Sequence, residues 1–245
     1  MKFFKQNLRV QILGNKAKDL LSLLKHSRGK KFFSETGEDS VLGNLIASKI
    51  GRYLDIGASH PVIGSNTFFL YRQGWKGIAV EPQLQFNLAW KISRPKDQII
   101  NCVVGPKETV KFYKFQNSLL STTNRDVALS HASRGLVWKE ESIESVPLSL
   151  LLPPTLSPSE EFLLNVDVEG TELECLGTID FTQQRPRYVL VESWSLPWVK
   201  KSKALYFLEQ NGYALLAYTG LTALMVPAEV IKSIRGLRQS LSEFD

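Results

Sequence analysis

The segment Tyr53-Leu54-Asp55-Ile56-Gly57-Ala58 is the strongest indication of the fold in this sequence. Its apolar run predicts a short strand, and Gly57 then allows a tight turn into a helix. A second apolar run, 78–80, predicts the next strand, and Glu81-Pro82 follows it; proline is favoured at the first position of a helix. A strand, a glycine turn, a helix and a second strand in this order are typical of a doubly wound parallel sheet.

Outward from this unit, strands and helices continue to alternate. Further strands are predicted at 99–104, 110–115, 143–150, 162–168, 188–192, 214–218 and 223–226, and helices at 66–73, 169–176 and 200–210. Strands separated by helices indicate parallel pairing with right-handed crossovers. The last two strands are joined too tightly around Gly220 for a crossover, so that pair is antiparallel. We predict an α/β fold: a doubly wound, mostly parallel seven-stranded sheet with an antiparallel last strand and an N-terminal helical arm.

Composition points to one domain, which we place at residues 32–245. The 245 residues are 43% hydrophobic and 22% charged, which is ordinary for a globular protein with a packed core. Cys102 and Cys175 both lie in apolar runs, so we expect two buried free thiols and a reducing, cytoplasmic environment. No apolar run approaches the roughly 18 residues that a membrane-spanning helix needs.

Residues 1–31 form a basic segment with a distinct charge. This segment contains nine Lys or Arg residues and one acid, so its net charge is +8. Because the whole chain has a net charge of +6, residues 32–245 have a net charge of −2. The spacing of the apolar residues in 1–31 predicts an amphipathic arm, one helix or two short ones. Peripheral contact with an anionic surface such as a membrane face is one interpretation. A helical flap packed on the domain, with its lysines in water, is the other.

The turn after the first strand indicates which cofactor binds. Glu81 lies 24 residues after Gly57, close to the spacing at which an acid accepts hydrogen bonds from ribose hydroxyls. A dinucleotide would need the denser turn G-x-G-x-x-G, and Asp55 would repel its pyrophosphate. Asp55 can instead face an ammonium group, directly or through water. These features favour S-adenosyl-L-methionine, although Asp55 and Gly57 could also serve only to form a tight turn.

The chain resembles the FkbM family of S-adenosylmethionine-dependent methyltransferases over roughly residues 32–226. The resemblance rests on segments that occur in order: Ser34-Glu35-Thr36-Gly37-Glu38-Asp39, Asp55-Ile56-Gly57-Ala58, His60-Pro61, Ser65-Asn66-Thr67, Gly74-Trp75-Lys76-Gly77, Glu81-Pro82, Ser121-Thr122, Asp167-Val168-Glu169-Gly170 and Arg185-Pro186. It implies the class I methyltransferase form of the Rossmann-like fold and methylation of a hydroxyl on a saccharide or natural-product-like acceptor. Glu35 stands where the family usually has Gln, which leaves the role of that segment open.

The pattern and the resemblance together give a set of predicted site residues. For cofactor binding we assign Asp55, Gly57, Ala58, Glu81, Pro82, Asn101, Ser34 and Glu38. A hydroxyl acceptor needs a general base, and Asp167 is the first candidate because it ends the strand expected beside the first one. Glu169 is a second candidate, although an acid at the start of a helix is also favoured by the helix dipole.

Two further residues have both a chemical and a structural interpretation. His60 follows the cofactor turn and could take the proton, but a loop histidine beside proline is as often a structural hydrogen-bonding group. Glu192 ends the strand after that of Asp167, and the pair could bind a divalent cation. Paired acids at strand ends are common without metal, so no metal site is predicted.

Other functions fit the sequence less well. A nucleic-acid methyltransferase would suit the basic charge, but the Pro-Pro-aromatic segment of amino-methylating enzymes is missing after the strand at 162–168, and neither cysteine follows a proline. A nicotinamide oxidoreductase is disfavoured by the glycine spacing. A nucleoside-binding module without catalysis remains an alternative.

Overall fold

The computed structural model describes residues 32–46, 50–152, 160–194 and 202–231. The arm predicted at 1–31 and the first residues of the helix predicted at 200–210 lie outside these ranges.

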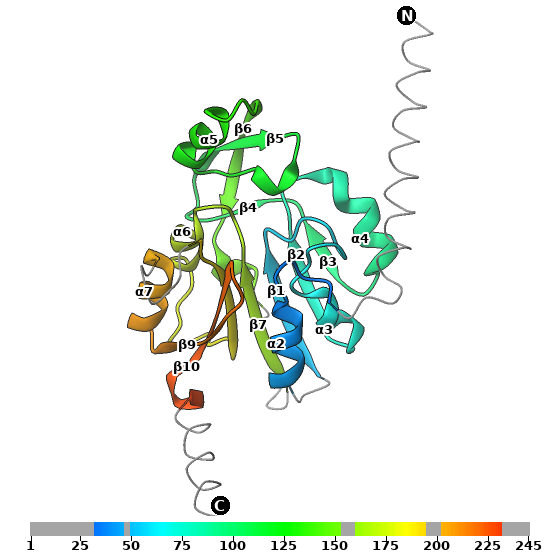
Figure 1. The fold of residues 1–245 in the computed structure, drawn as a ribbon, viewed down its shortest axis with the longest axis vertical. Helices are drawn as coiled ribbons and strands as arrows, with labels where there is room; N and C mark the ends of the chain where they lie inside the picture. The colour runs from blue at the N-terminus through cyan, green and yellow to red at the C-terminus, as the bar shows by residue number, and fades with distance from the viewer. Residues whose placement is uncertain (1–31, 47–49, 153–159, 195–201, 232–245) are drawn as a thin grey trace, which may run out of the picture.

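A seven-stranded sheet forms the centre of the molecule (Figure 1). Its strands, in spatial order, are β3 (Gln98–Ile100), β2 (Lys76–Val80), β1 (Gly51–Ile56), β7 (Glu161–Val166), β8 (Tyr188–Glu192), β10 (Thr222–Pro227) and β9 (Tyr213–Tyr218). Strands β3, β2, β1, β7 and β8 pair in parallel. The chain order reverses between β1 and β7, which makes their carboxyl ends the switch point where ligands bind in such sheets.

The last strand is antiparallel, as predicted. β10 lies between β8 and β9 and runs antiparallel to both, with Leu224 opposite Leu190 and Ala217. The tight connection around Gly220 permits this insertion, because Gly220 has a φ of 92°, a conformation that glycine adopts without strain. The predicted fold class is confirmed.

Helices cover both faces of this sheet. They are α2 (Glu38–Leu45), α3 (Phe68–Arg72), α4 (Asn87–Ser93), α6 (Glu172–Leu176) and α7 (Lys203–Gln210). Alternate strand residues point to opposite faces: Leu164 packs in one apolar cluster with Leu176 and Leu208, whereas Leu163 packs in another with Leu42 and Leu70. Strands buried on both faces explain why the sequence shows continuous apolar runs rather than alternation.

A small second sheet was not predicted. Strands β4 (Val103–Val104), β6 (Trp138–Val146) and β5 (Thr109–Phe115) form it, and it carries α5 (Arg125–Ala132), at the top of Figure 1. The single strand predicted at 99–104 is therefore wrong. The chain leaves the main sheet at Asn101, whose side chain donates to the Glu81 carbonyl oxygen at 2.7 Å, and β4 then pairs with β6.

Other element boundaries also differ from those predicted. The strand predicted at 143–150 is β6, which ends before Pro147 and is followed by a 3₁₀ turn at Leu148–Leu150. Further 3₁₀ turns lie at Leu84–Phe86 and Ser118–Leu120. The helix predicted at 169–176 begins only at Glu172, because Glu169 and Gly170 have positive φ angles of 58° and 99°.

Cys102 and Cys175 are buried and free, as expected. Within the part of the chain that the structure describes, no helix combines the length and apolar character needed to cross a bilayer.

Candidate active site

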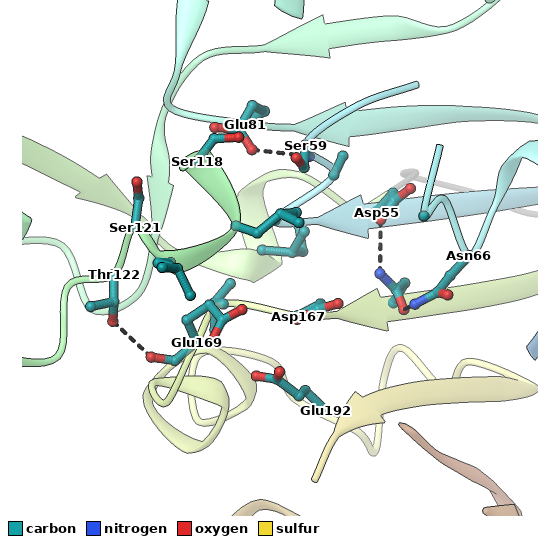
Figure 2. Close-up of a pocket in the computed structure, with 18 of the residues that line it drawn as sticks. Asp55, Ser59, Asn66, Glu81, Ser118, Ser121, Thr122, Asp167, Glu169 and Glu192 are labelled. Atoms are coloured by element: carbon teal, nitrogen blue, oxygen red, sulfur yellow. Dashed lines mark hydrogen bonds between the residues drawn. The ribbon is translucent and has the colours of Figure 1, made fainter. Parts of the chain in front are cut away.

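The carboxyl ends of four neighbouring strands open into one cavity of about 290 Å³. Gly57 follows β1, Glu81 follows β2, Asp167 follows β7 and Glu192 ends β8, and all four line it. The volume is near the lower end of the range for small-molecule sites. Figure 2 shows Glu81 and Ser59 at one end, and Asp167, Glu169 and Glu192 grouped at the other.

The turn after β1 requires glycine for two reasons. Gly57 has a φ of 78°, and a Cβ atom there would lie 1.6 Å from the carbonyl oxygen of Asp167. The backbone N–H groups of Gly57 and Ala58 donate to the Val80 carbonyl at 3.0 and 3.1 Å. Gly57 therefore allows the ends of β1, β2 and β7 to meet closely at the cavity wall.

Asp55 lies in this wall and is held by protein donors. It is 2% exposed, and its carboxylate accepts hydrogen bonds from Asn165 Nδ2 at 2.8 Å and from the Thr67 hydroxyl. Burial raises the pKa of Asp55, and the nearby Arg94 guanidinium opposes that rise. Both oxygens already have a partner, so the predicted contact with an ammonium group requires their remaining lone pairs or a bridging water, and it stays a prediction.

Glu81 faces the other end of the cavity. Its two carboxylate oxygens accept from the backbone N–H groups of Ser59 at 3.0 Å and Gln83 at 2.8 Å. Burial raises the pKa of Glu81 to about 7. Each oxygen keeps a further lone pair for a ligand hydroxyl.

Two buried polar atoms beside Glu81 have no hydrogen-bond partner within the described residues: the Ser59 hydroxyl and Gln83 Oε1. The Gln83 side chain is anchored through its Nε2, which donates to the Ser118 carbonyl at 3.2 Å. Unsatisfied buried polar atoms are uncommon and call for an explanation. A polar ligand beside Glu81 would supply the missing partners. The sequence did not indicate these two residues, because an unpartnered atom is recognisable only once the chain is folded.

Three carboxylates meet at the opposite end. One oxygen each of Asp167, Glu169 and Glu192 lies within 4.8 Å of the other two. Burial raises the pKa of all three acids, that of Glu169 to about 7 and that of Glu192 to about 10, and neighbouring carboxylates add to each rise. From the sequence, Asp167 and Glu192 were considered as a pair. In the structure, Glu169 lies beside them.

A strained turn directs Glu169 toward the cluster. Its φ of 58° is unusual for a residue with a side chain, and the Thr122 hydroxyl donates to its carbonyl oxygen at 2.7 Å. Asn124 Nδ2 donates to the next carbonyl, that of Gly170, at 2.9 Å. The segment from Asn117 to Thr123 thus closes one side of the cavity. The Ser121-Thr122 pair was the only sign of this segment in the sequence.

Not every predicted site residue reaches the cavity. Ala58, Pro82 and Glu38 line it, whereas Ser34, Asn101 and His60 do not. Asn101 supports the turn that carries Glu81. The Ser34 hydroxyl donates to Asp39 at 2.8 Å. Glu38 accepts from the Thr36 backbone N–H at 3.1 Å and from the Thr219 hydroxyl at 3.0 Å.

His60 forms hydrogen bonds within its own loop, which is the structural interpretation given for it above. Its Nδ1 accepts hydrogen bonds from the backbone N–H groups of Val62 at 3.2 Å and Ile63 at 2.9 Å. The nitrogen that faces these groups is therefore occupied, and the residue lies outside the cavity lining. The catalytic role considered for His60 stays a prediction.

The cavity is strongly acidic. Its lining includes seven carboxylic acids and, among the described residues, no Lys, Arg or His. The acids are Glu35, Glu38, Asp55, Glu81, Asp167, Glu169 and Glu192. Such a lining favours cationic or neutral ligands over anionic ones.

Comparison with known proteins gives one informative match. The model of the family described as "Methyltransferase FkbM domain" matches residues 55–215. No curated protein matches the chain.

The solved structures that match the chain include the following two, both at low identity. One is a precorrin-6y C5,15-methyltransferase from Geobacter metallireducens GS-15, with 13% identity, a TM-score of 0.39, and coverage of 81% of this chain and 91% of the other. The second is a TehB-like SAM-dependent methyltransferase from Corynebacterium glutamicum ATCC 13032 Kitasato, with 11% identity, a TM-score of 0.43, and coverage of 87% and 97%.

Proposed function

Because the chain belongs to the FkbM methyltransferase family, we propose that it transfers a methyl group from S-adenosylmethionine to a hydroxyl of a saccharide or similar natural-product-like acceptor. The observation that carries this proposal is the division of one cavity into two ends. Glu81 lies at one end and the cluster of Asp167, Glu169 and Glu192 at the other.

The residues at the Glu81 end fit a nucleoside. A carboxylate with free lone pairs can accept from both ribose hydroxyls, which is the role predicted for Glu81. The unpartnered Gln83 Oε1 can accept from an amino group, and the unpartnered Ser59 hydroxyl can donate or accept. S-adenosylmethionine supplies a methyl group on a positively charged sulfur, and the acidic lining favours that charge.

The cluster end fits the deprotonation of a hydroxyl. A hydroxyl oxygen is a weak nucleophile until its proton is removed, and a base with a raised pKa is a better proton acceptor than an ordinary carboxylate. We propose Asp167 as the general base, with Glu169 and Glu192 supporting it. The remaining contribution of the protein is to align the acceptor oxygen with the methyl group and to exclude water.

The same lining disfavours a nucleic-acid acceptor. A phosphodiester backbone would meet seven acids and no basic side chain within the described part of the cavity. Proteins that bind nucleic acid place Lys and Arg along the path of the phosphates. The basic excess of this chain lies instead in residues 1–31.

The test is methyl transfer by the full chain to a panel of saccharides and hydroxylated natural products, with mass spectrometry of the product. Asp167→Asn, which keeps the shape and removes the base, should lower kcat by about 100-fold or more. Asp180→Asn is the matched control, because Asp180 is exposed and lies outside the cavity, and it should leave kcat unchanged. Methylation of nucleic acid, or wild-type turnover in Asp167→Asn, would contradict the proposal. Binding of the cofactor with no turnover on any acceptor would favour a nucleoside-binding module.

A further inference from the structure

The three clustered carboxylates come from different parts of the fold. Asp167 follows β7, Glu169 occupies the strained turn after it, and Glu192 ends β8. In Figure 2 their side chains point toward one another at the cavity wall. With one oxygen of each within 4.8 Å of the others, they converge on a single point from three directions.

No positive charge of the described residues compensates this cluster. None of the ion pairs within the described ranges includes any of the three acids. The charged groups that act on Asp167 are all acids, among them Glu172 and Glu35. Like charges held this close disfavour ionisation of every member unless a cation joins them.

Glu192 supplies an independent observation that points to a ligand. It is only 9% exposed, and its Oε2 atom has no hydrogen-bond partner within the described residues. The side chain is aimed into the cavity beside Asp167 and Glu169. A buried carboxylate oxygen without a partner is costly, whereas the same atom as a ligand of a cation is satisfied.

We propose that Asp167, Glu169 and Glu192 bind one divalent cation of the oxygen-preferring class, such as Mg²⁺ or Mn²⁺. Carboxylate oxygens are ligands that suit Mg²⁺ and Mn²⁺, whereas zinc and copper sites usually include His or Cys. Two ligands of one octahedral ion at about 2.1 Å lie about 3 to 4 Å apart, which small side-chain rotations reach from the observed spacing.

This site deepens the proposed function on which it rests. The three acids line the same cavity as Glu81, so a cation bound by the cluster would lie at the wall of the space proposed for the acceptor. An acceptor hydroxyl on such a cation would have a lowered pKa and a fixed orientation, and a carboxylate of the cluster would take its proton.

The test is a titration of the full chain with Mn²⁺ alone, in which electron paramagnetic resonance measures the free ion. We expect saturable binding of one Mn²⁺ ion. Glu192→Gln, which removes one charged ligand with little change in shape, should weaken binding about tenfold or more. Glu174→Gln makes the same change at an exposed position on α6 outside the cavity, and binding should stay within about twofold.

Thermal unfolding of each variant shows that it is folded before it is titrated. Absence of saturable Mn²⁺ binding in the wild-type chain, or equal affinity in Glu192→Gln, would overturn the cation site. Because the titration contains neither cofactor nor acceptor, its result is separate from that of the transfer assay. Saturable Mn²⁺ binding that Glu192→Gln weakens would support the site even if no acceptor were methylated.

Discussion

At the scale of single residues, Gly57 shows how the sequence shapes the cavity. Alanine at this position would combine a left-handed backbone with a Cβ atom 1.6 Å from the Asp167 carbonyl oxygen. Because the contacting atom belongs to the backbone of Asp167, rotation of a side chain cannot relieve the clash. We expect Gly57→Ala to lower the free energy of unfolding by about 3 kcal/mol or more, or to prevent folding.

Gly135→Ala is the matched control for this prediction. Gly135 has a similar φ of 84°, but a Cβ atom there has nothing within 4 Å. This variant should lose only about 1 kcal/mol, from the backbone conformation. Urea unfolding of both variants measures the difference, and equal losses would show that the contact with Asp167 is unimportant.

The sequence indicated those candidate site residues that lie at the ends of strands. It did not indicate the residues that loops place in the cavity. Glu81 and Asp167 were predictable because an acid directly after an apolar run marks the carboxyl end of a parallel strand. Gln83 and Thr122 were not, because their roles depend on which atoms lack partners and which loop folds over the cavity. Asp55 was predicted as a cofactor-binding residue and lies in the cavity lining, and its hydrogen bonds to Thr67 and Asn165 could not be read from the sequence.

At the scale of elements, Arg94 ties the end of α4 to the loop after β1. Its side chain forms an ion pair with Asp97 at 2.7 Å, both side chains being fully buried. It also donates to the hydroxyls of Thr67 at 2.9 Å and Ser65 at 3.2 Å, which precede α3. The arginine therefore fixes the segment that holds Asp55.

We expect Arg94→Met to lower the free energy of unfolding by about 3 to 5 kcal/mol, because Asp97 would remain buried without the positive charge that balances it, although Tyr53 and Gly77 still donate hydrogen bonds to it. Arg187→Met is the control: Arg187 pairs with Glu161 at 2.9 Å, but its side chain is 49% exposed. An exposed pair contributes only about 0 to 1 kcal/mol. Chemical denaturation compares the two, and similar losses would contradict the structural role of Arg94.

The main sheet could be predicted and the small sheet could not, for a physical reason. Strands buried on both faces, such as β7 and β8, give continuous apolar runs that stand out from the surrounding sequence. β4 has only two residues, and most of β6 is exposed, so neither carries a strong pattern. Their pairing depends on contacts between distant residues, and periodicity reports only on local ones.

At the scale of the whole molecule, the acidic cavity makes stability depend on pH. The folded chain raises the pKa of Glu169 to about 7 and of Glu192 to about 10, so it binds protons that the unfolded chain releases. The stability that these groups contribute is complete below pH 4.5, the usual pKa of glutamate, and is lost as the pH rises toward 7 and then 10.

Glu192→Gln removes the largest of these contributions. In metal-free buffer, we expect its free energy of unfolding to fall less than that of the wild type between pH 5 and 9. The difference should exceed about 1.4 kcal/mol, the equivalent of one pKa unit. Urea titrations at the two pH values measure it, and parallel declines in the two proteins would show that Glu192 does not have a raised pKa.

Thermal unfolding with S-adenosylhomocysteine tests the proposal that S-adenosylmethionine binds with its nucleoside at Glu81. At about a hundred times its dissociation constant, the ligand should add about 2.7 kcal/mol and raise Tm by several degrees, whereas NAD should not. Each variant is compared with its own ligand-free Tm. Glu81→Ala should lose the shift, and Glu141→Ala, at an exposed position on β6, should keep it. A shift with NAD, or an undiminished shift in Glu81→Ala, would contradict the assignment of this cavity.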